Sequence, residues 1–105
     1  MAEATLINLG PVERIPLGEG REFEVGGELI AVFRARDGSL FGAQARCPHR
    51  AGHLADGVIG GGFVVCPLHA FRFELATGRS AGNDCRALKI YRATVNEDSE
   101  ILLSL

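Results

Sequence analysis

The sequence is poor in several features that would mark particular classes of protein. Its 105 residues include no Trp, and no apolar run is long enough to cross a bilayer. The first residues, Met-Ala-Glu-Ala-Thr, lack the basic and apolar regions of a signal peptide. The formal net charge is only −2, which argues against nucleic acid as a partner. We therefore expect a cytoplasmic chain that binds neither a membrane nor nucleic acid.

Motifs for nucleotide binding and for mononuclear metal catalysis are also missing. There is no Gly-rich dinucleotide fingerprint and no set of two His with a carboxylate. A chain of this length also leaves little room for a substrate domain. We expect a component that works with another protein and is not an enzyme by itself.

Cysteine and histidine are scarce, with three of each, yet four of these six residues fall in two short pairs. Cys47 and His49 form the first pair, Cys66 and His69 form the second, and sixteen residues separate the pairs. A Cys and a His this close cannot easily span one tetrahedral edge, but they can reach two adjacent irons. This spacing favours a binuclear centre in which one iron takes both cysteines and the other takes both histidines.

Three other interpretations of the four residues are open on residue type alone. Zinc accepts two Cys and two His, although the usual zinc spacing groups Cys with Cys and His with His. A catalytic Cys/His dyad would leave the second pair without a role. A disulfide between Cys47 and Cys66 satisfies the count, but nothing marks the chain as secreted.

The two pairs and their flanks resemble the Rieske proteins, whose pattern is C-x-H, a spacer of about this length, and C-x-x-H. The similarity extends through residues 49–57, 64–73 and 76–78, and more loosely through most of the chain. The resemblance implies that Cys47 and Cys66 bind the buried iron of one [2Fe-2S] cluster, and that His49 and His69 bind its outer iron. With two neutral imidazoles the oxidised cluster is formally neutral, whereas four thiolates would leave it negative. Histidine ligation therefore raises the reduction potential.

Four positions depart from the quinol-oxidising respiratory branch of that family. That branch joins its ligand loops by a disulfide, where this chain has Gly52 and Leu68. It also has Ser and Tyr hydroxyls that donate hydrogen bonds to sulfur, where this chain has Phe71 and Phe73. We therefore expect packing and backbone hydrogen bonds to hold the loops, and a potential near the low end of the Rieske range, about −150 mV. Such a potential suits electrons from a reduced flavin and not from quinol.

One histidine and one cysteine remain outside the two pairs. His53 follows His49 by four residues, where the family usually has a small residue or proline. We expect a structural or surface role for His53, with a proton-linked or partner-contact role as the alternative. Cys85 has no partner for a disulfide if the other two cysteines bind iron, and we expect it to be a buried packing residue.

Short apolar runs separated by turns predict strands and no helix. The candidate strands are residues 5–8, 22–25, 29–36, 40–44, 63–66, 71–75, 88–94 and 101–103. Tight turns are expected at residues 26–27 and 37–38, and a polar turn over residues 96–99. The pattern predicts a single all-β domain, residues 1–105, because no repeat or linker interrupts it. The resemblance adds an antiparallel β-sandwich or barrel-like base, residues 1–45 and 82–105, with a cluster-binding subdomain inserted over residues 46–81.

Basic residues accompany the ligand pairs, whereas acidic residues gather toward the two ends of the chain. Arg46, Arg50, Arg72 and Arg79 lie near the pairs in sequence, and acidic residues are concentrated over residues 13–28 and 97–100. These arginines either orient an acidic partner or form an ordinary solvated surface.

A cluster of this type moves one electron, so the resemblance implies an electron-transfer component. Two branches fit a domain of this size. One is the small subunit of NAD(P)H-dependent nitrite reductase, which residues 30–34 and 73–78 favour. The other is the ferredoxin that carries electrons from a flavin reductase to an aromatic-ring-hydroxylating dioxygenase. Either branch implies a flavin-containing reductase or subunit as donor and a terminal reductase or oxygenase as acceptor. A zinc-binding structural or interaction module is the remaining hypothesis.

Overall fold

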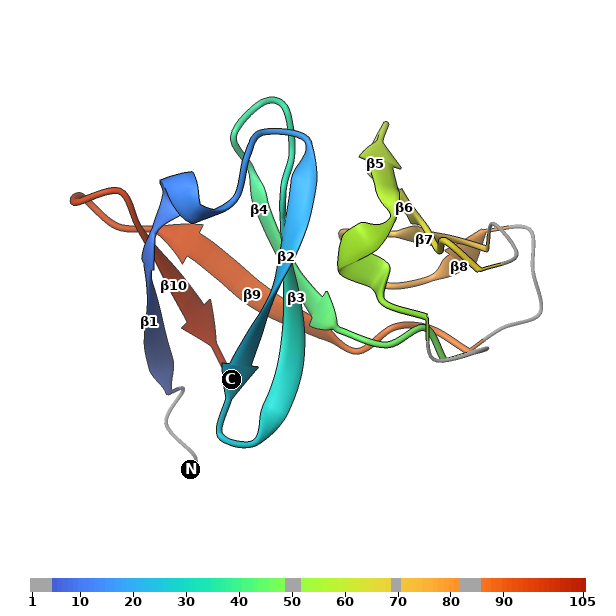
Figure 1. Ribbon diagram of the computed structural model, residues 1–105, viewed down its shortest axis with the longest axis horizontal. Helices are drawn as coiled ribbons and strands as arrows, with labels where there is room; N and C mark the ends of the chain where they lie inside the picture. The colour runs from blue at the N-terminus through green and yellow to red at the C-terminus, as the bar shows by residue number, and fades with distance from the viewer. Residues whose placement is uncertain (1–4, 49–51, 69–70, 82–85) are drawn as a thin grey trace.

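The computed structural model describes residues 5–48, 52–68, 71–81 and 86–105, which form ten strands and two short 3-10 helices (Figure 1). Six strands make one antiparallel sheet in the order β1-β10-β9-β4-β3-β2. These six are β1 (Leu6–Pro11), β2 (Glu19–Val25), β3 (Glu28–Arg34), β4 (Leu40–Gln44), β9 (Ile90–Val95) and β10 (Glu100–Ser104). The prediction of an all-β antiparallel fold is confirmed.

A second antiparallel sheet is formed entirely from the middle of the chain, in the order β5-β6-β7-β8. Its strands are β5 (Val58–Gly60), β6 (Phe63–Val65), β7 (Arg72–Glu74) and β8 (Ser80–Ala81). This small sheet lies at one end of the long axis of the molecule, to the right in Figure 1, and the six-stranded sheet occupies the other end. The 3-10 helix η2 (Leu54–Asp56) lies between them, and η1 (Val12–Arg14) follows β1.

Glycine pairs form two of the tight hairpins. Gly26 and Gly27, between β2 and β3, have φ of +58° and +82°, as a two-residue hairpin turn of the favoured type requires. Gly61 and Gly62, between β5 and β6, have nearly the same angles, +58° and +85°. The turn predicted at residues 26–27 is confirmed, and in the turn at residues 37–38 only Gly38 has a positive φ.

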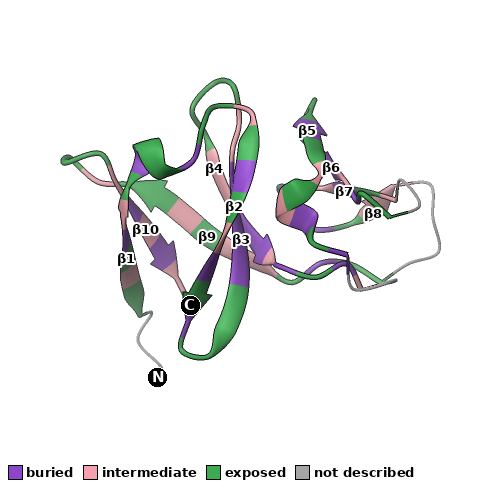
Figure 2. Cartoon of the chain, in the orientation of Figure 1, coloured by how far each residue is buried: buried purple, intermediate pink, exposed green. Residues whose placement is uncertain are grey.

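Strand β3 is buried on both faces, which explains its uninterrupted apolar run (Figure 2). Successive side chains of a strand point to opposite faces. Ile30 and Val32 therefore enter one core, whereas Ala31 and Phe33 enter another. The first, which we call the base core, is completed by Leu9, Val12, Ile15, Phe23, Val25, Ile101 and Leu103. The second, the shared core, is completed by Ala43, Cys47, Leu54, Ile59, Val64, Cys66, Phe73, Leu75 and Leu88.

The shared core joins the two sheets, and a glycine on β2 allows η2 to approach. A Cβ atom at Gly20 would lie 2.6 Å from Cδ1 of Phe33 and 3.3 Å from Cα of Ala55. No larger residue fits at position 20 unless the buried Phe33 ring moves. Helix η2 therefore packs directly on β2 and β3, and the small sheet reaches β3 through the side chains of the shared core.

The carboxylate of Glu100 on β10 is hydrogen-bonded to the edge strand β1. Its Oε1 accepts hydrogen bonds from the side-chain amides of Asn96 and Asn8, each at 3.1 Å. These hydrogen bonds, that from Asn96 first, lower the pKa of Glu100 because they stabilise its charged form.

The predicted strands differ from the observed ones mainly at their ends. Residues 40–44 coincide with β4, and the predicted strand over residues 29–36 corresponds to β3 but ends later than the observed one. The short strands β5 and β8 were not predicted. Within the described residues, no helix is long and apolar enough to cross a membrane.

Candidate metal centre

Cys47 stands at the start of a narrow loop that follows β4. Its side chain is 2% exposed and belongs to the shared core. The backbone N–H of Cys47 donates to the carbonyl of Gly52 at 2.8 Å, and the N–H of Leu54 donates to the carbonyl of Ala45 at 2.9 Å. These two hydrogen bonds join the two ends of the loop. The predicted ligand His49 falls in the sequence between them.

Cys66 occupies the equivalent place in a second loop, directly after β6. Its side chain is 1% exposed and belongs to the same core as Cys47. The backbone N–H of Cys66 donates to the carbonyl of Phe71 at 2.7 Å, which closes the loop before β7 begins. The predicted ligand His69 falls in the sequence enclosed by this hydrogen bond. His49, His69 and Cys85 lie outside the described residues, so their roles stay predictions.

The two loops meet at Gly52 and Leu68, the positions where the respiratory branch has its cross-linking cysteines. A Cβ atom at Gly52 would lie 3.1 Å from Cγ of Leu68 and 3.2 Å from Sγ of Cys66. Glycine therefore leaves room for the second loop, including its sulfur, against the first. The prediction that packing and backbone hydrogen bonds hold these loops agrees with these contacts.

The setting of the two sulfurs fits a metal-bound pair of thiolates. Among the described residues no polar or charged side chain is buried in the core. An apolar core disfavours an uncompensated thiolate, whereas a bound metal ion supplies the compensating charge. Cys47 and Cys66 do not form a disulfide bond in this structure. In a Rieske-type cluster both protein ligands of the inner iron are cysteines. Two thiols from two loops that meet supply this donor set.

Phe71 and Phe73 both contact the shared core that contains the cysteines, but they differ in how far they are buried. Phe73 is fully buried in the shared core, and Phe71 packs against that core from a partly exposed position. Both rings are apolar and donate no hydrogen bond toward the sulfurs. Their positions agree with the expectation that this chain lacks the hydroxyl donors of the respiratory branch.

His53 ties the first loop to the six-stranded sheet. Its Nδ1 lies 2.6 Å from Oε2 of Glu22 on β2, and an ionised carboxylate can only accept, so Nδ1 donates. His53 also forms an isolated antiparallel bridge with Arg46 between the two ends of the loop. The structural role expected for His53 agrees with these contacts, although the sequence did not indicate Glu22 as its partner.

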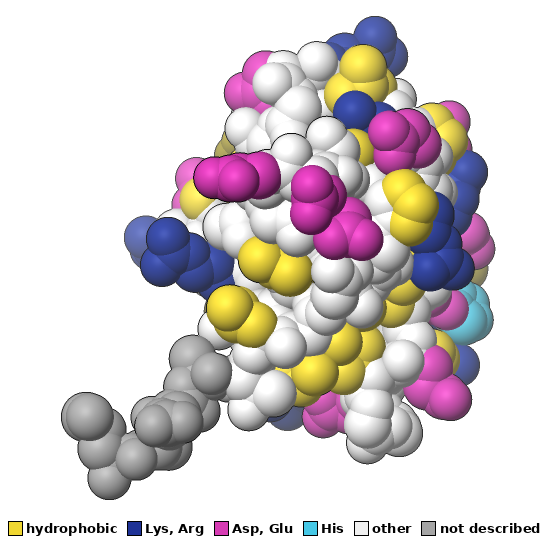
Figure 3. All heavy atoms as spheres, turned by 90° about the vertical axis from the view of Figure 1, so that its left-hand side faces the viewer, with side chains coloured by type: hydrophobic (Ala, Val, Ile, Leu, Met, Phe, Trp, Pro, Cys, Tyr) yellow, Lys and Arg dark blue, Asp and Glu magenta, His cyan; other side chains and the backbone are white. Residues whose placement is uncertain are grey.

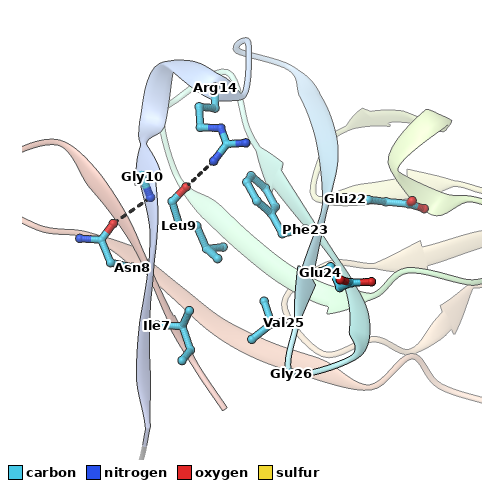
Figure 4. Close-up of a pocket in the computed structure, with 10 residues that line it drawn as sticks. All are labelled: Ile7, Asn8, Leu9, Gly10, Arg14, Glu22, Phe23, Glu24, Val25 and Gly26. Atoms are coloured by element: carbon cyan, nitrogen blue, oxygen red, sulfur yellow. Dashed lines mark hydrogen bonds between the residues drawn. The ribbon is translucent and has the colours of Figure 1, made fainter.

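A groove of about 700 Å³ lies away from the cysteines, between β1 and β2 (Figure 4). Its lining includes Ile7, Leu9, Phe23 and Val25. Arg14 crosses one end, where Nη1 donates to the carbonyl of Leu9 at 3.0 Å and the guanidinium lies 5.2 Å from the centre of the Phe23 ring. Neither predicted cysteine ligand lines this groove, so it is not part of the candidate centre.

Relatives in sequence include ferredoxins of oxygenase systems. The chain is 31% identical over 74 residues to the ferredoxin component of naphthalene 1,2-dioxygenase/salicylate 5-hydroxylase systems from Ralstonia sp., covering 70% of each chain. It is 32% identical over 82 residues to a biphenyl dioxygenase ferredoxin subunit from Pseudomonas sp., covering 76% of this chain and 74% of the relative.

Solved structures show the same fold over nearly the whole chain. The ferredoxin of carbazole 1,9a-dioxygenase from Nocardioides aromaticivorans superposes with a TM-score of 0.84 at 27% identity, covering 94% of this chain and 96% of that one. A Mycobacterium tuberculosis protein described as an NADH-dependent nitrite reductase small subunit superposes with a TM-score of 0.90 at 21% identity, covering 99% and 97%. At that identity the second likeness concerns the fold alone.

The family description "Rieske [2Fe-2S] domain" matches residues 5–92, which include both Cys/His pairs. This match and the ferredoxin relatives agree with the buried cysteine pair and the two closed loops. The chain therefore belongs to the Rieske [2Fe-2S] family, with a Rieske-type cluster as its cofactor and one-electron transfer as its function.

Proposed function

We propose that Cys47, His49, Cys66 and His69 hold the cluster, and that the chain carries single electrons between a flavin-containing reductase and a terminal oxygenase. When bound, the cluster supplies a centre that gains and loses one electron. The observation that carries the proposal is the burial of Cys47 and Cys66 in one core, on two loops that meet. The proposal includes a single Rieske domain over residues 1–105, with residues 46–81 as its cluster-binding part, and a cytoplasmic location.

The chain's own residues prepare the site before any metal binds. The hydrogen bonds Cys47 N–H to Gly52 and Cys66 N–H to Phe71 fix the start of each ligand loop. Pro48 and Pro67 follow the two cysteines and restrict φ there, which lowers the entropy lost on metal binding. The surrounding apolar side chains exclude water from the sulfur side of the centre.

An oxygenase is preferred as acceptor because the ferredoxin relatives exceed 30% identity over about seven tenths of their length. The nitrite reductase branch, favoured by residues 30–34 and 73–78, is the second candidate. It is supported by the close superposition with the Mycobacterium tuberculosis protein, which covers almost all of both chains. In either system this chain is a carrier or subunit, and the catalytic site belongs to its partner.

The two candidates differ in the protein that reoxidises the chain. The chain, purified with its cluster, is reduced by a small flavoprotein reductase and NADH, and then mixed with a ring-hydroxylating oxygenase and its aromatic substrate. Substrate-dependent reoxidation and hydroxylated product support the ferredoxin. Stable capture of a large sirohaem subunit, with nitrite-dependent reoxidation, supports the nitrite reductase. Failure of a cluster-loaded chain to accept an electron from any flavoprotein would contradict both.

A further inference from the structure

The charges are divided unequally between the middle of the chain and the rest of it. Residues 46–89 contain six Lys or Arg and three Asp or Glu, a formal charge of +3. The rest of the chain contains five Lys or Arg and ten Asp or Glu, a formal charge of −5, and the two parts give the total of −2. The small net charge therefore conceals an unequal distribution of charge along the sequence.

The fold brings part of this positive charge to the small sheet, where Arg72 lies on β7 and Arg79 directly precedes β8, whereas Arg46 and Lys89 lie beside Glu28 of the six-stranded sheet. The small sheet β5–β8 occupies one end of the longest axis, which extends 38 Å, and the six-stranded sheet occupies the other (Figure 1). The face seen at the six-stranded end carries both acidic and basic side chains among apolar and uncharged ones (Figure 3). At physiological salt the Debye length is about 8 Å, so a partner close to one end is affected mainly by the charges of that end.

The arginines of the small sheet lie on the outer face of β6, β7 and β8. Along these strands Val64 and Phe73 point inward to the shared core, whereas Phe63 and Arg72 point outward. The guanidinium of Arg72 lies 5.7 Å from the centre of the Phe63 ring. Beside them a shallow hollow of about 230 Å³ is lined by Phe63, Glu74, Arg79, Ser80 and Ala81. We call this surface the β7 face.

The two arginines of the β7 face keep their charges available to a partner. Among the described residues the salt bridges join Arg21 to Glu19 and His53 to Glu22, so neither Arg72 nor Arg79 is paired there. Glu74 is the acidic residue of this face, and its Oε1 accepts from the hydroxyl of Thr77 at 2.6 Å.

Two strands of the β7 face, β6 and β7, adjoin the second ligand loop. Cys66 directly follows β6, and β7 begins at Arg72, three residues after the proposed ligand His69. Arginine and aromatic side chains are also the residue types that dominate the energetics of protein interfaces. A partner seated on this face is therefore beside the point where electrons leave or enter.

We propose that the β7 face, with Arg72, Arg79 and Phe63 at its centre, docks an acidic, carboxylate-bearing surface of the redox partner. This inference rests on the proposed function, because only a redox partner needs to approach the ligand loops. Attraction between the arginines of the β7 face and the carboxylates of the partner orients the chain before contact. The arginines accordingly act as a docking surface and not as inert solvated residues.

The first test maps where an anion binds, and it does not require electron transfer. Hexacyanochromate(III), an inert paramagnetic anion, is added to the oxidised, ¹⁵N-labelled protein, and the broadening of each backbone amide signal is measured. We expect broadening at residues 72–74 and 79–81 at concentrations that leave β1 and β10 unaffected. Equal broadening at both ends, or broadening confined to the six-stranded end, would overturn the proposal.

The second test uses the sign of a salt effect. Oxidation of the reduced protein by ferricyanide moves one electron and gives ferrocyanide and the oxidised protein. Attraction by the β7 face predicts that the rate constant falls by roughly tenfold as salt rises from about 0.01 to 0.1 M. If the net charge governed the encounter, this anion would be repelled and its rate would rise with salt, which would contradict the proposal.

Matched variants separate local charge from net charge. Arg72→Gln and Arg79→Gln should each slow the ferricyanide reaction at low salt and weaken its salt dependence. The control Arg92→Gln makes the same change in net charge at an exposed position on β9, in the six-stranded sheet, and should leave the rate unchanged. Equal effects of all three variants would overturn the assignment. A protein without iron would contradict the proposed function, yet the anion map would still test the surface.

Discussion

The contact between the ligand loops predicts a specific response to Gly52→Ala. The new methyl group would lie 3.1 Å from Cγ of Leu68 and 3.2 Å from Sγ of Cys66, so both neighbours must move by a few tenths of an ångström. Leu68 is 44% exposed and can move into solvent, whereas Cys66 is 1% exposed and is fixed by the core. We expect a loss of about 1 kcal/mol in the free energy of unfolding, at the low end for an overpacked site. We also expect a shift in the electron paramagnetic resonance spectrum of the reduced cluster.

A second substitution separates the effect of the contact with Leu68 from that of the contact with Cys66. Leu68→Ala removes the atoms behind the 3.1 Å contact but leaves the sulfur at 3.2 Å. The double variant should therefore recover stability relative to Gly52→Ala, while the spectral shift persists. Stability is measured by urea unfolding of the cluster-loaded protein.

Gly60→Ala is the matched control, because a Cβ atom at this exposed end of β5 meets nothing within 4 Å. It should change stability by less than about 0.5 kcal/mol and leave the spectrum unaltered. If Gly52→Ala behaves like this control in both measurements, the two loops do not meet as described and the reasoning is refuted.

Three further predictions concern side chains around the site and at the sheet edge. Glu22→Gln replaces the carboxylate that faces His53 Nδ1 with a neutral amide and, at this partly exposed position, should cost less than about 1 kcal/mol in urea unfolding; a much larger loss would mean that the contact organises the loop. The depressed pKa of Glu100 adds stability above the ordinary carboxyl value of 4.5, which is lost as pH falls through the lower folded value, so Glu100→Gln should flatten acid unfolding below about pH 4.5; an unchanged acid limb would exclude this contribution. His69→Cys should lower the reduction potential of an assembled cluster, because it adds negative charge, and an unchanged voltammetric potential would mean that His69 is not a ligand.

The sequence predicts a ligand set because each Cys/His pair is local. The structure places Cys47 and Cys66 in one core, and the ligand roles of His49 and His69 stay predictions. Each Cys/His pair lies within four residues, and a short loop keeps such a pair together whatever the rest of the chain does. β4 was also predicted in full, because its five residues lie between clear turn signals. The other predicted strands match observed ones with errors of a few residues at their ends, whereas β5 and β8 were missed.

Features that depend on distant residues could not be predicted in the same way. His53 and Glu22 are 31 residues apart in sequence, and no periodicity connects them. β5 and β8 are only three and two residues long, too short for an alternating pattern to appear. The early start of β2 at Glu19 follows from its pairing with Arg34 of β3, which a run of charged residues and glycine does not reveal. In each case tertiary pairing decides the structure.

The most direct test of the account is the composition and ligation of the centre in the purified protein. Iron, acid-labile sulfide and zinc are measured per chain, and pulsed electron paramagnetic resonance of the reduced protein detects nitrogen bound to iron. Two irons and two sulfides with coupling to two imidazole nitrogens are expected for a cluster held by two Cys and two His. A colourless protein with one zinc, or a cluster without nitrogen coupling, would contradict the assignment.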